Sequence, residues 1–187
     1  PNFIDTKTFP EPPEPGFRNS IADPETPILT HISNFREVKR VEDVVKLFSE
    51  VRQTIPAKLL MVGDGPERTK AEKACRELAY CNDVRFMGKM DDVAKILNIS
   101  DLFLLPSATE SFGLAALEAM TAGVPVISSD TGGLPEVNIS GKTGFTAPVG
   151  HTKEMAHKAL KLLSNQSMMT QFKEQAVAQA KAFDITK

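Results

Sequence analysis

Two glutamates eight residues apart, Glu110 and Glu118, carry the most suggestive chemistry of this 187-residue chain. An apolar run at residues 102–105 precedes them, and the segment Ser-Phe-Gly-Leu at 111–114 lies between them. A strand followed by a loop and a helix N-terminus can bind an anion, because the first N–H groups of a helix have no partner within it. Ser111 is the candidate N-cap, and Gly113 would let a ligand approach the backbone closely.

Glu118 differs from Glu110 because its neighbours from 114 to 120 are all leucine, alanine or methionine. A carboxylate in such an apolar segment needs a hydrogen-bonding partner, and the hydroxyl groups of a ligand such as ribose could provide it. The spacing alone also fits a buried crossover helix whose one glutamate is hydrogen-bonded within the protein. The motifs in the rest of the chain are needed to choose between the two interpretations.

A basic loop at residues 33–40 precedes a predicted amphipathic helix at 41–55. It contains three cations within five residues, Arg36, Lys39 and Arg40. Cations are mildly unfavourable at a helix N-terminus, so their position indicates an anionic ligand. A solvated basic loop is the alternative.

Glycine-containing turns follow three further predicted strands. Residues 63–68 (GDGPER) open like a dinucleotide fingerprint, but Arg68 replaces its third glycine, so a tight turn into a helix is favoured over an NAD site. The turn Gly88-Lys89 could present backbone groups to a flat base. The pair Gly132-Gly133 could turn several N–H groups towards an anion, although such a pair is also common in flexible loops.

Short apolar strands alternate with helices along the chain. The strands are expected at 28–32, 58–62, 84–87, 102–105, 124–128 and 144–147. The helices are expected at 41–55, 67–81, 91–98, 153–163 and 168–183, with a further short helix that follows the segment 111–114 and stops near Gly123. This alternation predicts an α/β fold, a Rossmann-like parallel sheet with helices on both faces. Ligands of such sheets bind outside the carboxyl ends of the strands, where the strand order reverses.

Residues 1–27 contain seven of the thirteen prolines. This composition excludes a helix or central strand around residues 10–16 and predicts an extended interdomain linker, with a PxxP ligand as the alternative. The folded domain is expected at 28–187. Because the chain starts at Pro1 without a methionine, we expect it to be part of a longer protein.

The overall composition, with a net charge of −2 and 41% hydrophobic residues, predicts no attraction to nucleic acid and no stable membrane insertion. Cys75 and Cys81 lie on one predicted helix, too far apart to bridge easily. We therefore expect reduced structural thiols and a cytoplasmic protein. The three histidines lack the spacing of metal ligands, and each is expected to be structural or solvated.

The order of these motifs resembles the C-terminal nucleotide-sugar-binding domain of retaining glycosyltransferases of family 4, which have the GT-B fold. The shared order is a basic loop, GDGPER, VxFxG, PSxxESFGLxxLEAMxxGxPVI, GGxPE and GxTGF, over about residues 28–165. The resemblance implies one half of a GT-B enzyme. The N-terminal acceptor domain would be absent, so this chain alone is expected to be inactive, and an oligomer is possible.

The resemblance also implies roles for matching residues. Glu118 would bind the ribose hydroxyls, Glu110 a hydroxyl of the donor sugar, and Lys39 the phosphates. The segment of Ser111, Phe112, Gly113 and Leu114 would bind the sugar and the distal phosphate. The turn at Gly88 and Lys89 would contact the uracil. Asn34 occupies the position of a family arginine, and Arg36 is the candidate replacement.

Residues 32–40 resemble more narrowly the branch of the family that transfers N-acetylglucosamine from UDP-GlcNAc to L-malate in bacillithiol biosynthesis. This implies a UDP-sugar donor and a small acceptor, with no metal or other cofactor and no covalent nucleophile. A UDP-sugar 2-epimerase-like enzyme and a noncatalytic nucleotide-binding module are the alternatives. A glycosidase that uses paired carboxylates does not fit a parallel sheet with a basic anion site.

Overall fold

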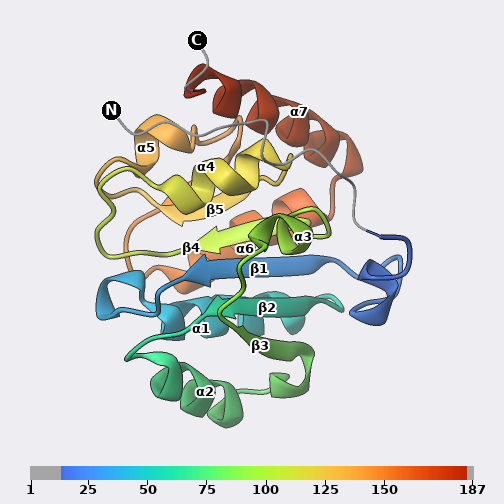
Figure 1. The fold of residues 1–187 in the computed structure, drawn as a ribbon, viewed down its shortest axis with the longest axis vertical. Coiled ribbons are helices and arrows are strands. Elements are labelled where there is room, and N and C mark those ends of the chain that lie inside the picture. The colour runs from blue at the N-terminus through green and yellow to red at the C-terminus, as the bar shows by residue number, and fades with distance from the viewer. Residues whose placement is uncertain (1–13, 185–187) are drawn as a thin grey trace.

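A computed structural model describes residues 14–184 of the chain. Its core is a six-stranded parallel sheet with the order β3-β2-β1-β4-β5-β6 (Figure 1). The strands are β1 (Ile28–Ser33), β2 (Lys58–Gly63), β3 (Val84–Gly88), β4 (Leu102–Leu105), β5 (Val126–Ser129) and β6 (Gly144–Ala147). This is the order of a doubly wound Rossmann sheet, so the predicted fold class is confirmed.

Helices cover both faces of the sheet. They are α1 (Val41–Arg52), α2 (Arg68–Glu77), α3 (Val93–Leu97), α4 (Leu114–Thr121), α5 (Leu134–Val137), α6 (Thr152–Leu163) and α7 (Gln166–Ala182). The core residues of α1, α2 and α6 join one buried cluster, and those of α4 and α5 join another. The helix α7 contributes to both, since Phe172 belongs to the first cluster and Ala176 to the second.

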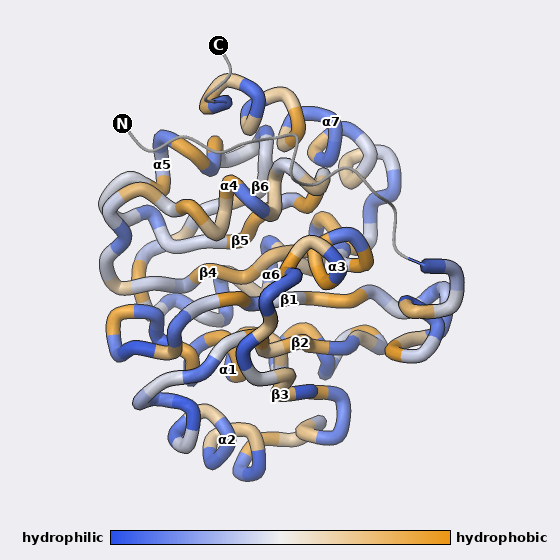
Figure 2. Tube along the Cα trace, in the orientation of Figure 1, coloured by the Kyte–Doolittle hydropathy of each residue, from blue (hydrophilic) through white to orange (hydrophobic). Residues whose placement is uncertain are grey.

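The strand β4 shows why these elements fold as they do. Its side chains alternate between the two clusters, with Leu102 and Leu104 in the first and Phe103 and Leu105 in the second. All four are buried, because a central parallel strand has a helix layer on each side. Figure 2 shows that the strands at the centre of the sheet are coloured mainly as hydrophobic residues.

The strand order reverses between β1 and β4. The chain leaves β1 for its neighbour β2 on one side, whereas β4 pairs with β1 on the other side. Crossovers that diverge in this way leave a crevice at the carboxyl ends of the two strands. The loops that follow β1 and β4 therefore meet at the place where such sheets bind ligands.

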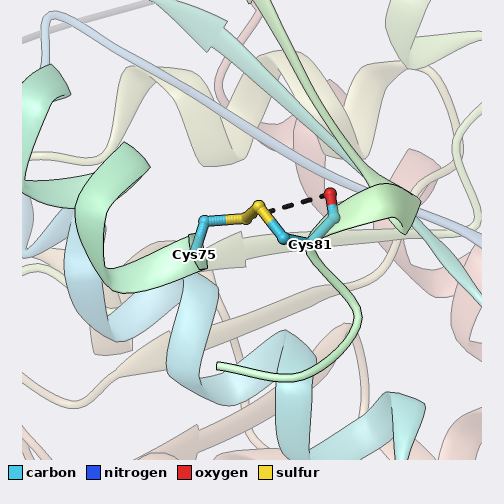
Figure 3. The surroundings of a disulfide bond; sticks show 2 residues. All are labelled: Cys75 and Cys81. Carbon is cyan, nitrogen blue, oxygen red and sulfur yellow. Dashed lines mark hydrogen bonds between the residues drawn. A yellow bond between two sulfur atoms is a disulfide. The ribbon is translucent and has the colours of Figure 1, made fainter. Parts of the chain in front are cut away.

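The helix expected at 67–81 is shorter than predicted. It ends at Glu77, Leu78 is extended, and Tyr80 adopts a left-handed conformation with φ 76°. The chain then reverses through a 3₁₀ turn (Cys81–Asp83) into β3. This reversal brings the Cα atoms of Cys75 and Cys81 to 5.1 Å, and the two residues form a disulfide (Figure 3). The expectation of two reduced thiols on one helix is wrong.

This disulfide leads to a stability prediction. It closes a small loop, with a sequence separation of 6, and the loop-entropy relation gives a stabilisation of about 2 kcal/mol for a ring of that size. Adding a reductant should lower the free energy of unfolding by up to that amount in urea denaturation. A Cys75→Ala, Cys81→Ala variant should not respond to the reductant, and an equal response of both proteins would contradict the prediction.

The cysteines no longer support a cytoplasmic location, which stays a prediction. Among residues 14–184, no helix is long and apolar enough to cross a membrane.

Residues 14–27 turn around a short 3₁₀ helix (Arg18–Ser20) instead of running extended. Ile21 and Ala22 are buried in a third small cluster with strand residues, and Arg18 bonds Asp101 at 3.2 Å. This part of the proline-rich segment therefore packs on the domain. Residues 1–13 lie outside the described structure, and the predicted role of 1–27 as an interdomain linker stays a prediction.

Candidate functional site

A cavity of about 310 Å³ opens at the crevice between the carboxyl ends of β1 and β4. It is formed by the end of β1 and the loop after it, together with the loop between β4 and α4. Its lining residues are Ile32, Ser33, Asn34, Lys39, Glu110, Ser111, Phe112, Gly113, Leu114 and Ala115. The cavity thus lies where a doubly wound sheet binds its ligand.

The β4–α4 loop provides backbone donors. The N-cap of α4 is Gly113, with φ 85°, so the prediction that Ser111 caps the helix is wrong. A left-handed residue at this position turns the chain sharply, and no side chain of residues 14–184 caps the helix. Within the described residues, the N–H groups of Phe112, Gly113 and Leu114 donate to no other protein group. These donors remain available to an anion.

Lys39 and Glu110 meet at this cavity. The Nζ atom of Lys39 donates to Oε2 of Glu110 at 2.7 Å, and the two side chains are 20% and 13% exposed. The N–H of Ala108 also donates to the carbonyl of Val38 at 2.7 Å. The loops after β1 and β4 are therefore joined by a backbone bond and by an ion pair.

The GDGPER turn supports the first of these loops. A Cβ atom at Gly63 would overlap the carbonyl oxygen of Ser33, and one at Gly65 would overlap that of Asn34. The N–H of Glu67 donates to the carbonyl of Phe35 at 2.9 Å. The turn leads into α2, as expected from the sequence, and its glycines let the two backbones pack in direct contact.

The glycine pair at 132–133 supports the second loop. A Cβ atom at Gly132 would overlap the carbonyl oxygen of Glu110, and one at Gly133 would overlap that of Ser111. The N–H of Gly133 donates to the Glu110 carbonyl at 2.9 Å. The N–H of Gly133 is therefore occupied within the protein and is not available to an anion, and both glycines let the two backbones pack in direct contact.

The buried side chain of His31 connects the ends of β1 and β4 through two hydrogen bonds. Its Nδ1 donates to the carbonyl of Leu104 at 2.8 Å, so Nε2 accepts from the Ser33 hydroxyl at 2.8 Å. Burial lowers the pKa of His31 to about 4, so the ring is neutral at pH 7. The expectation of a structural histidine is confirmed.

The structure does not bring every predicted residue to the cavity. Arg36 is exposed and outside the lining, and its side chain has no partner among the described residues. Gly88 and Lys89, at the end of β3, and Glu118, on α4, also lie outside the lining. The binding roles of these four residues stay predictions. The sequence interpretation gave no individual role to three lining residues, Ile32, Ser33 and Ala115. Ser33 belongs to the predicted anion-binding loop, and the signal for the other two is that they adjoin predicted residues.

Glu118 is half-buried on α4, and its carboxylate has no hydrogen bond or ion pair within the described part of the chain. Desolvation raises its pKa. A charged group of this kind destabilises the empty domain, because the folded state disfavours the ionised form.

Replacing Glu118 by Gln should therefore stabilise the domain at pH 7, by up to about 1 kcal/mol after allowance for partial solvent contact. Because the folded pKa is raised above the unfolded one, the wild type regains stability as pH falls through the folded pKa. The difference between the two proteins should shrink in that direction. Thermal unfolding at several pH values measures it, and Glu174→Gln on the exposed face of α7 is the control. A Glu118→Gln variant less stable than wild type at pH 7 would refute the desolvation argument.

Comparison with known proteins agrees with this geometry. Residues 15–179 match the family described as Glycosyl transferases group 1. The chain is 48% identical over 149 residues to N-acetyl-alpha-D-glucosaminyl L-malate synthase of Bacillus anthracis, covering 80% of this chain and 39% of that protein. It is 35% identical over 177 residues to trehalose synthase of Pyrococcus horikoshii, covering 88% of the chain and 42% of the relative. The chain thus spans about two-fifths of these relatives.

Solved structures share the fold over nearly the whole chain. Sucrose-phosphate synthase of Thermosynechococcus elongatus superposes with a TM-score of 0.87 at 27% identity, covering 98% of this chain and 48% of that one. Anabaena HepE, solved in complex with UDP and glucose, superposes with a TM-score of 0.87 at 23% identity, covering 98% and 51%. At that identity the second likeness shows the fold alone. By the match over residues 15–179, this chain belongs to the glycosyl transferases group 1 family.

Proposed function

We propose that this chain is the donor-binding half of a retaining glycosyltransferase that transfers N-acetylglucosamine from UDP-GlcNAc to L-malate. The observation that carries the proposal is the convergence of free N–H groups at the start of α4 with Lys39 in one cavity at the sheet's reversal point. Such a site suits a diphosphate. The 48% identity to a malate-linking N-acetylglucosaminyl enzyme supports the choice of donor and acceptor.

In this proposal, the donor-binding half of the enzyme stabilises the negative charge that develops during sugar transfer. When the bond between the sugar's anomeric carbon and the diphosphate oxygen breaks, negative charge grows on the leaving diphosphate. In this proposal, Lys39 and the N–H groups of Phe112, Gly113 and Leu114 bind that charge, which is supported by their shared place in the cavity lining. We propose that these groups replace a metal ion in the reaction.

The carboxylates orient the donor in this proposal. Glu110, in the cavity, accepts a hydrogen bond from a sugar hydroxyl. Glu118 accepts from the ribose hydroxyls, which would give its unpartnered, desolvated carboxylate the bonds that it lacks. The uracil lies near the turn at Gly88 and Lys89, and Asn34 or Arg36 completes the phosphate contacts.

The acceptor would bind to the remainder of the longer protein. We expect the donor and acceptor halves to face each other across the crevice, so that the chain alone binds UDP and UDP-GlcNAc without transferring the sugar.

The experiment uses the full-length protein with UDP-GlcNAc and a panel of hydroxyl acceptors that includes L-malate, with mass spectrometry of the products. We expect an N-acetylglucosaminyl malate and free UDP, with UDP-GlcNAc unchanged when no acceptor is present. An isomerised UDP-sugar formed without an acceptor would favour the 2-epimerase. Failure to consume UDP-GlcNAc with any acceptor would favour a noncatalytic module.

A further inference from the structure

The ion pair between Lys39 and Glu110 occupies the site that the proposed donor needs. Both residues line the cavity, and their side chains are in contact at 2.7 Å and mostly buried. No other partner is present for either charged group within residues 14–184. In the empty site, the carboxylate of Glu110 is thus the counterion of the cation that faces the ligand.

A ligand that binds Lys39 through phosphate oxygens has to compete with this carboxylate. A bare nucleoside diphosphate brings only negative charge to the pair, so binding leaves Glu110 without its counterion and close to the phosphates. A diphosphate that carries a sugar brings hydroxyl donors as well. A hydroxyl can donate to Glu110 while the phosphates take Lys39, so both groups remain satisfied.

We propose that Glu110 makes the site select a sugar-bearing nucleoside diphosphate over the bare nucleoside diphosphate, by competing for Lys39. This inference rests on the proposed function and deepens it. Its consequence for turnover concerns the product. Once the sugar has left, Glu110 loses its hydroxyl donor and returns to Lys39, which weakens the hold on the diphosphate and favours its release.

The test compares the affinities of UDP and UDP-GlcNAc for the wild type and for Glu110→Gln, by calorimetry on this chain. The amide keeps the size of the side chain but removes the competing charge. We expect UDP to bind about three- to tenfold tighter to the variant, the range for a partly exposed ion pair. UDP-GlcNAc should gain less or lose affinity, so the preference for the sugar-bearing ligand should fall.

Two controls separate competition for Lys39 from a general charge effect. Glu37→Gln removes the same charge from an exposed position two residues before Lys39 and should change UDP affinity less than twofold. In a Lys39→Met background, Glu110→Gln can relieve only the direct repulsion between Glu110 and the phosphates, because no lysine is left to be freed. Its gain in UDP affinity should therefore be smaller than in the wild-type background. Glu110→Ala, with thermal unfolding of each variant, provides a second substitution if the glutamine variant does not fold.

The outcomes distinguish the inference from the proposed function. If the wild type binds neither UDP nor UDP-GlcNAc, the proposed function fails and the inference with it. If the wild type binds both and the Glu110 variants bind UDP no more tightly, the proposed function stands and the inference is wrong. An equal gain in the Lys39→Met background, or with Glu37→Gln, would also overturn it.

Discussion

Replacing Lys39 by methionine is expected to weaken UDP binding by about a hundredfold, as measured by calorimetry. A hydrogen bond between a charged donor and a charged acceptor contributes about 1.5–3 kcal/mol where water is partly excluded. The side chain of Lys39 is only 20% exposed. The variant also leaves Glu110 without its counterion beside the phosphates, which adds repulsion to the lost attraction.

The matched control for this variant is Lys46→Met, which removes the same charge from an exposed position on α1 outside the cavity lining. It should change UDP affinity less than twofold at physiological ionic strength, because exposed charges are screened over about 8 Å. Equal UDP affinities for the folded Lys39→Met protein and the wild type would show that Lys39 does not bind the phosphates.

Gly63→Ala is expected to lower the free energy of unfolding by about 3 kcal/mol or more in urea denaturation. A Cβ atom at this position would overlap the Ser33 carbonyl, and φ is 128°, where side chains are strained. The clash lies against the backbone of the loop that carries Asn34 and Lys39. Relief of the clash has to move that loop, so the variant should also bind UDP more weakly.

Gly141→Ala separates backbone strain from the clash. Gly141 has φ 84°, but no atom of the described residues lies within 4 Å of its added Cβ atom. This variant should therefore lose only about 1–2 kcal/mol and keep its UDP affinity. If Gly63→Ala lost no more stability than Gly141→Ala, the packing of the GDGPER turn against the β1 loop would not be needed.

The regular elements could be predicted because their burial follows a simple pattern. The strands β4 and β6 begin and end at the predicted residues. For β4 the reason is that a short apolar run bounded by turn residues fits a strand buried between two helix layers. The C-terminus of α2 was missed because the periodic pattern continues past Glu77. The helix ends at Glu77 and the chain then reverses direction into β3. The Cys75–Cys81 disulfide depends on that reversal.

The site was predictable where the signal is local. The 111–114 segment and Asn34 line the cavity with Lys39 and Glu110, as their positions in loops after strands indicate. The contact between Lys39 and Glu110 joins residues 71 positions apart and depends on β4 pairing beside β1. The part played by Gly132 could not be read from the sequence either, because it needs the backbone of another loop.

The central claim is that the crevice between β1 and β4 binds the diphosphate of a sugar nucleotide. Amide chemical-shift mapping of this chain during titration with UDP tests it residue by residue. We predict that the largest shifts occur at the N–H groups of Phe112, Gly113 and Leu114, with smaller ones at Asn34. No shifts at saturating UDP, or shifts confined to residues away from the α4 N-terminus and the β1 loop, would contradict the account.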